Sequence, residues 1–374
     1  MGVLLKILVV AVLGVIAQQA LRIVNSWGVF AHYYQHYPGP CQTVEGVQPG
    51  SEDFHILPNG QALISSGLRY EIFDPKCKEF WKKHGVKGRM YLMDLQNVQA
   101  APRELKITST SQFNADTFAP HGISVVEDSK QGRHVVFVVN HPYGDEAVAS
   151  RVEKFLYDPL KQELIHQTYF SDPTMMVVND LQATGENSFY FTNSNYFTKP
   201  LAVLLEVLLE LPLTDVVYFD GQTYTVVDSG LKSPNGVAMS PGGKYVYVAY
   251  FVAREIAVYK RNEDNTLRPV QKYPLYGWPD NIQVDQKTGH LFVALHPLAY
   301  KFLAYTDDIG GQTTPSQVIQ LAVEDGLIKS SQELFYDHGD LISGSSTAIV
   351  YDGTLLVGSV FHNLVTCKVN VPLL

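Results

Sequence analysis

Short hydrophobic segments alternate with polar turns along most of the chain, in a unit that recurs about every 45 to 70 residues. Each unit has a polar or acidic pair, a hydrophobic strand, a turn and a second hydrophobic strand. Paired strands repeating at this length are typical of β-propeller blades. The units read EDFHILPNGQALISSG, HGISVVEDSKQGRHVVFVVNH, NDLQATGENSFYFTNSN, NGVAMSPGGKYVYVAY, DNIQVDQKTGHLFVALHP and SSTAIVYDGTLLVGSVFHN. Six units predict an all-β fold, a six-bladed propeller.

Four of these six units begin with carboxylate or amide side chains. Equivalent positions of successive blades converge on the axis of a propeller, so we expect these side chains to meet there. Singly, such residues are more often turn or cap residues. Together, several buried charges need a cation to offset their burial, and calcium prefers carboxylate and amide oxygens. The predicted metal ligands are Glu52, Asp53, Asn179, Asp180, Asn235, Asp280 and Asn281.

Three histidines occupy the ends of these units. His121 begins the second unit and His141 ends it, whereas His296 ends the fifth. A lone histidine is usually only a satisfied polar residue. Beside an oxygen-bound cation, however, His121 and His141 are candidates for a general base acting on water. For His296 we expect a substrate contact or a supporting role.

Composition narrows the range of functions. The repeat covers about residues 50 to 365 of the 374, which leaves no room for a second domain. A formal net charge of −9 argues against a nucleic-acid partner. The sequence contains no G-x-S-x-G elbow, H-E-x-x-H helix, P-loop or dinucleotide fingerprint. Hydrolytic chemistry would therefore depend on the bound metal and not on a serine nucleophile.

The three cysteines suggest how the propeller closes. Cys41 precedes the first unit and Cys367 follows the last strand, so a Cys41–Cys367 disulfide would join the two ends of the ring. The alternative is three reduced, buried thiols. Cys77 lies in a polar stretch and is the odd cysteine in the first case.

Residues 1–24 form an apolar N-terminus with one lysine before the run from Ile7 to Ala17. That run has the length of a secretory signal and is short for a transmembrane helix. A cleaved signal peptide and a retained signal-anchor both direct the chain into the secretory pathway, to an extracellular or lumenal location. We favour the anchor, with the propeller in residues 25–374.

A second apolar segment, Pro200 to Val217, interrupts the repeat between the third and fourth units. Its leucine spacing predicts a surface helix with Glu206 and Glu210 on one face, ended or kinked by Pro212. One interpretation places this helix on a membrane or lipoprotein surface beside the N-terminal helix. The other packs it over the top of the propeller.

At these residues the sequence resembles the paraoxonase family of calcium-dependent lactonases and arylesterases. The resemblance extends from Cys41 to Cys367 and rests on the runs GSEDFHILPNGQALISSGLRY, HGISVVED, VVNHP, NGVAMSPGGKYVYVAY, DNIQVD and LLVGSVFHNLVTCKV. It implies a six-bladed propeller with two calcium ions, the Cys41–Cys367 disulfide, and attachment to membranes or lipoprotein through the hydrophobic N-terminus and a surface helix.

The resemblance also implies roles for single residues. A catalytic calcium would be held by Glu52, Asn179, Asn235, Asp280 and Asn281, and a structural calcium by Asp53, Asp180 and the backbone carbonyl of Ile123. The histidine dyad of the family falls on His121 and His141. Its substrate-site tyrosine and histidine fall on Tyr70 and His296.

Three regions depart from the family pattern. Leu295 replaces the cysteine that precedes the family's His-Pro dipeptide, and Cys77 lies elsewhere. The segment from Glu71 to Gly88 is longer, and the loop from Thr198 to Val217 diverges. Because loops of this kind determine substrate preference, the physiological substrate is the property that transfers least.

These observations favour a calcium-dependent hydrolase of lactones and aryl esters, with organophosphate (paraoxonase) activity as a further hypothesis. Water would be activated by His121 with support from His141, or by a carboxylate such as Glu52 or Asp280. The alternative is a membrane-anchored, non-catalytic assembly factor for membrane proteins. The apolar N-terminus and the Pro200–Val217 segment fit that role, whereas a scaffold does not need the full set of ligands and histidines.

Overall fold

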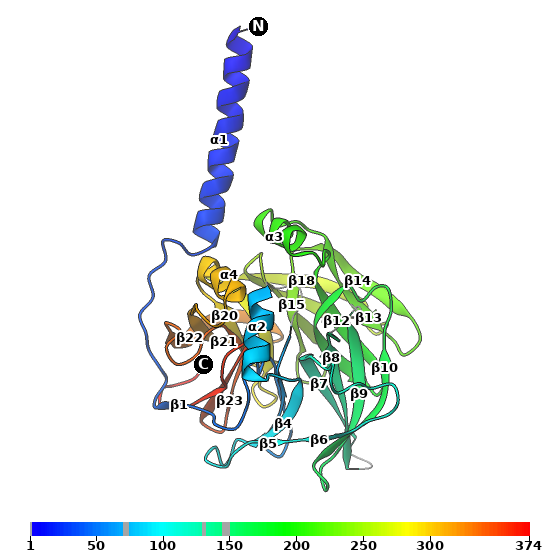
Figure 1. Cartoon of the computed structure of the whole chain (residues 1–374). Coiled ribbons are helices and arrows are strands. Elements are labelled where there is room, and N and C mark those ends of the chain that lie inside the picture. Colours follow the sequence, from blue (N-terminus) through cyan, green and yellow to red (C-terminus); the bar gives the residue numbers. More distant parts are fainter. Residues whose placement is uncertain (1, 70–74, 129–131, 144–149) are drawn as a thin grey trace.

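A computed structural model of the protein describes residues 2–69, 75–128, 132–143 and 150–374. Figure 1 shows sheets arranged around a central axis, with the helices gathered at one end. Six sheets are formed, and the predicted six-bladed propeller is confirmed. In each blade the innermost strand begins with the polar residues of one repeat unit.

The first three blades are built as follows. Blade 1 contains β2 (Phe54–Ile56), β3 (Gln61–Ser66), β4 (Arg89–Asp94) and β5 (Arg103–Glu104). Blade 2 contains β7 (Pro120–Asp128), β8 (Arg133–Asn140), β9 (Arg151–Asp158) and β10 (Glu163–Phe170), with β6 (Lys106–Thr108) parallel to β10 at its outer edge. Blade 3 contains β11 (Val177–Gly185), β12 (Ser188–Asn195), β13 (Thr214–Phe219) and β14 (Tyr224–Leu231).

The remaining blades complete the ring. Blade 4 contains β15 (Pro234–Met239), β16 (Tyr245–Tyr250), β17 (Glu255–Arg261) and β18 (Leu267–Pro274). Blade 5 contains β19 (Trp278–Val284), β20 (Leu291–His296), β21 (Ser316–Glu324) and β22 (Leu327–Asp337). Blade 6 contains β23 (Ser345–Tyr351), β24 (Thr354–Ser359), β25 (Val365–Lys368) and β1 (Cys41–Thr43).

Hydrophobic packing between neighbouring blades forms the core. The second strand of a blade is covered on both faces, so β8 reads as an almost continuous run of valine and phenylalanine. Between blades 2 and 3, Phe137, Phe170, Phe189 and Phe219 form a chain of ring contacts with centroids 5.2 to 5.6 Å apart. Such contacts hold each inner strand at a fixed distance from the axis.

The ring is closed by the two ends of the chain. Strand β1 pairs antiparallel with β25, and Cys41 lies opposite Cys367 in this register. The two cysteines form a disulfide across a sequence separation of 326 residues. The predicted covalent closure is therefore confirmed.

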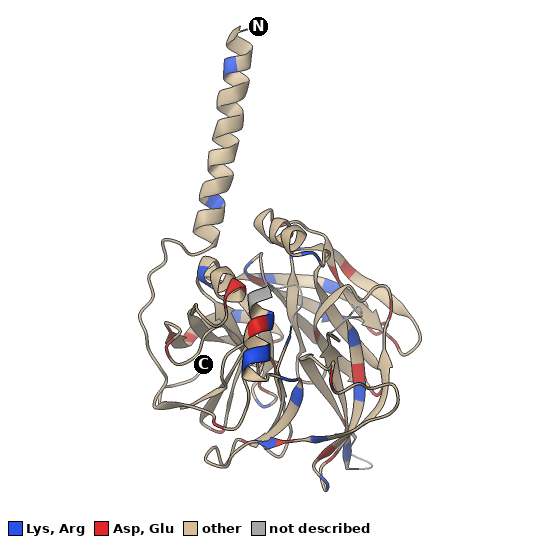
Figure 2. Cartoon of the chain, viewed as in Figure 1, with Lys and Arg blue, Asp and Glu red and all other residues tan. Residues whose placement is uncertain are grey.

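Helix α1 (Gly2–Ser26) projects from the helical end of the propeller (Figure 1). Its 25 residues span about 37 Å at 1.5 Å per residue, more than the roughly 30 Å of a bilayer core. The helix is thus longer than the apolar run from Ile7 to Ala17, because it continues well beyond Ala17. Its only charged residues are Lys6 and Arg22, and Figure 2 shows the helix mostly in the colour of uncharged residues. A signal sequence has the same features.

Three shorter helices cover the end of the propeller from which α1 projects. They are α2 (Pro75–His84), α3 (Pro200–Leu208) and α4 (Ala299–Asp307). Cys77 and Trp81 of α2 pack with Phe302 and Tyr305 of α4 in one apolar cluster, and the Cys77 thiol donates to the carbonyl of Thr306. The sequence pattern did not predict α2, and it placed Cys77 in a polar stretch although the side chain is buried.

Helix α3 is shorter than the predicted Pro200–Val217 segment and lies within blade 3, between β12 and β13. Val216 and Val217 belong to β13 and are buried. Its one acidic residue does not face water, and Glu210 lies after the helix and is half-buried. Glu206 is buried and accepts the backbone N–H groups of Tyr196 and Phe197. Leu201 and Leu209 are instead 70% and 61% exposed, so apolar side chains face outward.

Candidate active site

Irregular strand starts aim the polar residues at the axis. The ladder between the first and second strands shifts register between Pro120 and Ile123, between Pro234 and Val237, and between Pro279 and Ile282. An extra residue in one strand re-aims side chains at a β-bulge. The His121, Asn235 and Asp280 positions all fall inside these shifts. The bulges therefore explain why the predicted ligands point into the tunnel and not into the blade interfaces.

Glycines let the inner strands approach one another. A Cβ atom at Gly122 would lie 2.4 Å from Asp180 Oδ1, and one at Gly236 would lie 2.6 Å from Asn281 Cα. Both distances are shorter than a side chain tolerates. The pairs His121-Gly122 and Asn235-Gly236 thus join a functional side chain to a position where only glycine fits.

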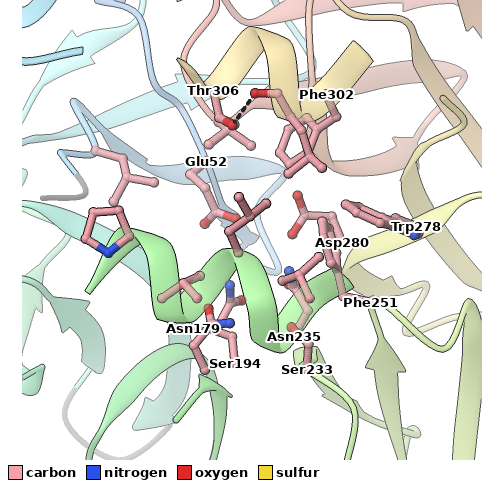
Figure 3. Close-up of a pocket in the computed structure, with 18 of the residues that line it drawn as sticks. Glu52, Asn179, Ser194, Ser233, Asn235, Phe251, Trp278, Asp280, Phe302 and Thr306 are labelled. Carbon is pink, nitrogen blue, oxygen red and sulfur yellow. Dashed lines mark hydrogen bonds between the residues drawn. The ribbon is translucent and has the colours of Figure 1, made fainter. Parts of the chain in front are cut away.

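The first set of predicted ligands lies together at the bottom of a cavity. Figure 3 shows Glu52, Asn179, Asn235 and Asp280 pointing toward a common centre from four inner strand starts. Asn281 donates to Glu52 Oε1 over 2.7 Å, which places its amide beside the same cluster. The structure thus brings together all five residues proposed for the catalytic ion.

Unsatisfied oxygens test whether this cluster suits a hard cation. Among the residues that the structure describes, four buried oxygens of the cluster lack a hydrogen-bond partner: Glu52 Oε2, Asn179 Oδ1, Asn235 Oδ1 and Asn281 Oδ1. A buried acceptor without a partner costs about 1–3 kcal/mol, so four at one place need a common partner. Carboxylate and amide oxygens are calcium ligands. The described residues contain no group of three or more His, Cys, Asp and Glu placed for metal binding, so the amides are essential to the fit.

The pKa shifts of the buried carboxylates also favour a bound cation. Burial raises the pKa of Glu52 well above its usual range, and the nearby charge of Asp280 raises it further. Burial also raises the pKa of Asp53 and of Asp180, and in each case a neighbouring carboxylate adds to the shift. A cation would relieve this repulsion and keep the carboxylates ionised.

Asp53 and Asp180 form a second acidic pair close to Ile123. Asp53 Oδ2 accepts the backbone N–H of Ile123 over 2.9 Å, and Asp180 Oδ2 accepts that of Val237 over 2.8 Å. Both carboxylates are buried. They retain further lone pairs, so the residues proposed for the structural ion are also suited to one.

His121 and His141 form a buried pair at the side of the cluster. His121 Nδ1 lies 2.9 Å from His141 Nε2, and His121 Nε2 lies 3.5 Å from Glu52 Oε1. Burial lowers the pKa of His121 to about 4 and that of His141 well below its usual range. Both rings are therefore neutral near pH 7, the state that a base requires.

His296 lies behind Asp280 and not in the cavity wall. The His296 side chain is fully buried and stacks on Phe302 at a centroid distance of 3.6 Å. Its Nε2 is 2.8 Å from Asp280 Oδ2. Of the two expected roles, a substrate contact or a supporting role, this position beside a proposed ligand fits the second. Tyr70, the other residue expected to touch substrate, lies outside the described residues.

A cavity of about 370 Å³ opens above the polar cluster. Its upper wall is apolar and comes from α3, α4, the start of β19 and the turn after β16, including Leu201, Leu204, Phe251, Trp278 and Phe302. The described lining residues include no lysine or arginine. Sequence reasoning missed α4 as part of this wall, because AYKFLAYTD carries no strong helix signal and follows a blade strand directly.

Comparison with known proteins agrees with the resemblance seen in the sequence. The model of a protein family described as Arylesterase matches residues 36–369. The chain is 35% identical to serum paraoxonase/arylesterase 1 of Homo sapiens over 328 residues, 88% of each chain. It is 34% identical to serum paraoxonase/lactonase 3 of Rattus norvegicus over 333 residues, 88% of this chain and 89% of that one.

Solved structures of lower identity share the fold. One is a putative gluconolactonase (TM-score 0.51, 15% identity, covering 89% of this chain and 93% of that one). Another is a calcium-binding protein, regucalcin, from Agrobacterium tumefaciens (TM-score 0.51, 12% identity, covering 90% and 96%). At this identity the likeness concerns the propeller alone.

Proposed function

The chain belongs to the arylesterase (paraoxonase) family, and from this premise we propose that it is a calcium-dependent hydrolase of lactones and aryl esters. The calcium requirement is supported by four buried oxygens that lack a hydrogen-bond partner among the described residues. They belong to Glu52, Asn179, Asn235 and Asn281. Three of these residues, Glu52, Asn179 and Asn235, line a cavity of about 370 Å³ that also has an apolar wall.

Each residue of the cluster has a defined task. Glu52, Asn179, Asn235, Asp280 and Asn281 would hold the catalytic calcium, and Asp53, Asp180 and the Ile123 carbonyl a structural one. When bound, the catalytic ion supplies Lewis-acid stabilisation of the charge that develops on the ester carbonyl oxygen. The hydrogen bonds from His296 to Asp280 and from Asn281 to Glu52 hold these side chains in orientation.

His121 is our choice for the general base. Its Nε2 faces the cluster, its ring is neutral near pH 7, and its Nδ1 is held by His141. Glu52 is the second candidate, because it lies 3.5 Å from the same nitrogen. Asp280 is less suited, since His296 already donates to its Oδ2.

The cavity favours neutral, largely apolar substrates. Leu201, Leu204, Trp278 and Phe302 would contact the acyl or aryl part, while the polar cluster meets the reacting carbonyl. The described lining residues include no lysine or arginine, so the wall above the cluster offers no cationic side chain to a substrate. Assays with a series of lactones, esters and organophosphates would identify the preferred substrate.

Membrane attachment completes the proposal. Arg22 of α1 forms a salt bridge of 2.7 Å with Glu210, the residue that follows the C-cap of α3. This contact brings α1 beside the exposed leucines of α3, so both helices present apolar residues at the same end (Figure 1). We therefore propose a signal-anchored enzyme of the secretory pathway with an extracellular or lumenal propeller. The alternative of a non-catalytic assembly factor finds no support in the comparisons.

The test uses the full chain, purified in detergent with calcium. Phenyl acetate and a set of lactones are assayed before chelation with EDTA, after it, and after calcium is restored. We expect hydrolysis that is lost on chelation and recovered on addition of calcium. A folded, calcium-loaded protein with no turnover on any of these substrates would contradict the proposal.

A further inference from the structure

Trp27 is the first residue after α1, and its ring packs on the wall of the cavity from outside. The ring meets that of Trp278 edge to face, with centroids 6.3 Å apart and an interplanar angle of 82°. Trp278 lines the cavity, whereas Trp27 is half-buried and is not among the described lining residues. Trp27 packs against the apolar cluster that contains Trp278 and Phe302. It therefore supports the wall without touching the space that a substrate would occupy.

The backbone beside Trp27 is seated closely on the loop that leads into α4. The N–H of Trp27 donates to the carbonyl of Ile23 over 2.9 Å at the end of α1. Gly28 then takes a φ of 72°, and a Cβ atom there would lie only 2.6 Å from the carbonyl oxygen of Pro297. Glycine thus permits a close approach that fixes where the Trp27 side chain meets the wall.

The connector between α1 and β1 is held along blade 5. Tyr33 stacks on Tyr336 at a centroid distance of 4.8 Å and donates its hydroxyl to the carbonyl of Tyr276 over 2.9 Å. Tyr37 donates to the buried carboxylate of Asp337 over 2.6 Å. Figure 1 shows the connector, in blue, descending beside this blade toward β1. These contacts keep the connector, and with it the tryptophan at its start, in one position on the propeller.

Trp278 is the outer member of an aromatic layer that forms one side of the cavity. Its ring lies 4.8 Å from that of Phe251, which lies 6.0 Å from that of Phe302. All three residues line the cavity. Because protein interiors are close-packed, a ring removed behind this layer leaves a void into which the neighbouring ring can relax. Loss of the Trp27 ring would let Trp278 move outward and widen the cavity.

We infer that Trp27 is a positioning residue that holds Trp278 in place and thereby limits the size of the aryl or acyl group that the cavity accepts. The inference rests on the proposed function, because the group in question belongs to the ester or lactone. It gives the residue after the apolar helix a role in substrate selection that is separate from attachment to a membrane.

The test compares W27A, W27F and the control F30A in the calcium-loaded full chain, purified in detergent. Phe30 lies in the same connector and is 69% exposed. The substrates are phenyl acetate and 2-naphthyl acetate, which carry the same acyl group and differ by one fused ring. In W27A we expect the ratio of kcat/KM for the larger ester to that for the smaller to rise at least about threefold. W27F keeps an aromatic ring and should change the ratio less, and F30A should keep the wild-type ratio.

The separate kinetic constants distinguish a change of the wall from a loss of structure. The effect of W27A should appear mainly in KM, with kcat for phenyl acetate changed less than about twofold and calcium affinity unchanged. Equal losses on both esters, or a loss of calcium affinity in proportion to kcat, would show that Trp27 only supports the fold, and the inference would be wrong. An unchanged ratio in W27A would overturn it as well.

Fluorine-19 NMR tests the contact without relying on turnover. The chain has three tryptophans, so labelling with 5-fluorotryptophan gives three signals, which W27F, W81F and W278F assign. The Trp278 signal should shift in W27A and not in F30A. The unreactive ketones acetophenone and 2-acetonaphthone should also move this signal. Relative to the smaller ketone, the larger one should bind W27A at least about threefold more tightly than it binds the wild type.

These readouts separate the inference from the proposed function. A wild-type protein that hydrolyses neither ester overturns the proposed function, while the ketone titration still decides whether Trp27 sets the size of the cavity. Hydrolysis of both esters in the same ratio by all variants, with a Trp278 signal that is unchanged in W27A, overturns the inference alone.

Discussion

His296 Nε2 lies 2.8 Å from Asp280 Oδ2, in a pair that is buried behind the polar cluster. A histidine N–H on one carboxylate oxygen leaves the other oxygen directed to the cavity. Hydrogen bonds of this kind to a ligand typically contribute 10- to 100-fold in metal affinity.

We therefore predict that H296A weakens calcium binding about 10- to 100-fold, measured by isothermal titration calorimetry of the EDTA-treated protein. Activity should return at high calcium concentration. The exposed His338 provides the control, and H338A should bind calcium like the wild type. Unchanged affinity in H296A would show that the contact does not orient Asp280.

The raised pKa values of Glu52, Asp53 and Asp180 predict how calcium stabilises the fold at different pH. Without calcium, the folded chain binds more protons than the unfolded chain, so it loses stability as pH rises above about 4.5. With calcium, the ion offsets the carboxylate charges. The difference in Tm between calcium-loaded and EDTA-treated protein should therefore grow from about pH 4.5 upward. A difference that stays constant with pH would contradict this linkage.

Gly122 predicts a packing requirement at the axis. A Cβ there would lie 2.4 Å from Asp180 Oδ1 and 2.7 Å from Asp180 Cα. G122A should lower the free energy of unfolding by about 1–3 kcal/mol and weaken calcium binding, because Asp180 must shift. G310A is the control, since a Cβ at Gly310 meets nothing closer than 3.3 Å. Chemical denaturation measures both. Equal stability of G122A and G310A would be inconsistent with the close approach.

The disulfide predicts a redox-sensitive fold. Breaking the Cys41–Cys367 link opens a loop of 326 residues in sequence, for which the chain-entropy model gives a loss of about 6 kcal/mol at most. The double variant C41S/C367S should unfold at a lower denaturant concentration than the wild type. Reducing agent should lower the wild-type midpoint and leave the variant unchanged. If both proteins respond alike to reduction, the destabilisation has another origin.

The exposed leucines of α3 predict a membrane contact separate from the anchor. In a chain lacking residues 1–26, replacing Leu201, Leu205 and Leu209 with glutamine should reduce binding to neutral phosphatidylcholine vesicles in a flotation assay. Three matched changes at the polar surface positions Lys244, Lys260 and Lys287 should have little effect. Equal flotation of the two variants would exclude α3 as a docking element.

The repeat in the sequence predicted the blades because strand alternation and turns are local signals. It also predicted which polar side chains meet at the axis, since each lies at the same place in its unit. The inward orientation of Glu206 escaped prediction because its partners, the backbone N–H groups of Tyr196 and Phe197, lie outside the helix. The bulges that aim Asn235 and Asp280 are also invisible in sequence, because they depend on pairing between strands.

The length of α3 was also predicted wrongly, and again the reason is pairing between strands. Leucine periodicity extended the predicted helix into residues that pair with β12 and β14, where burial in the sheet overrides helical propensity. The apolar composition of α1 was evident from the sequence. The length of the helix was not, because it depends on residues after the most apolar run.

Metal analysis of the purified protein tests most directly whether the amide and carboxylate oxygens at the propeller axis bind calcium. Inductively coupled plasma mass spectrometry after dialysis against micromolar calcium should find two calcium ions per chain in the wild type. It should find one in N235A, which removes an orphaned oxygen of the catalytic set and leaves Asp53 and Asp180 intact. A folded wild-type protein that retains no calcium would contradict the claim.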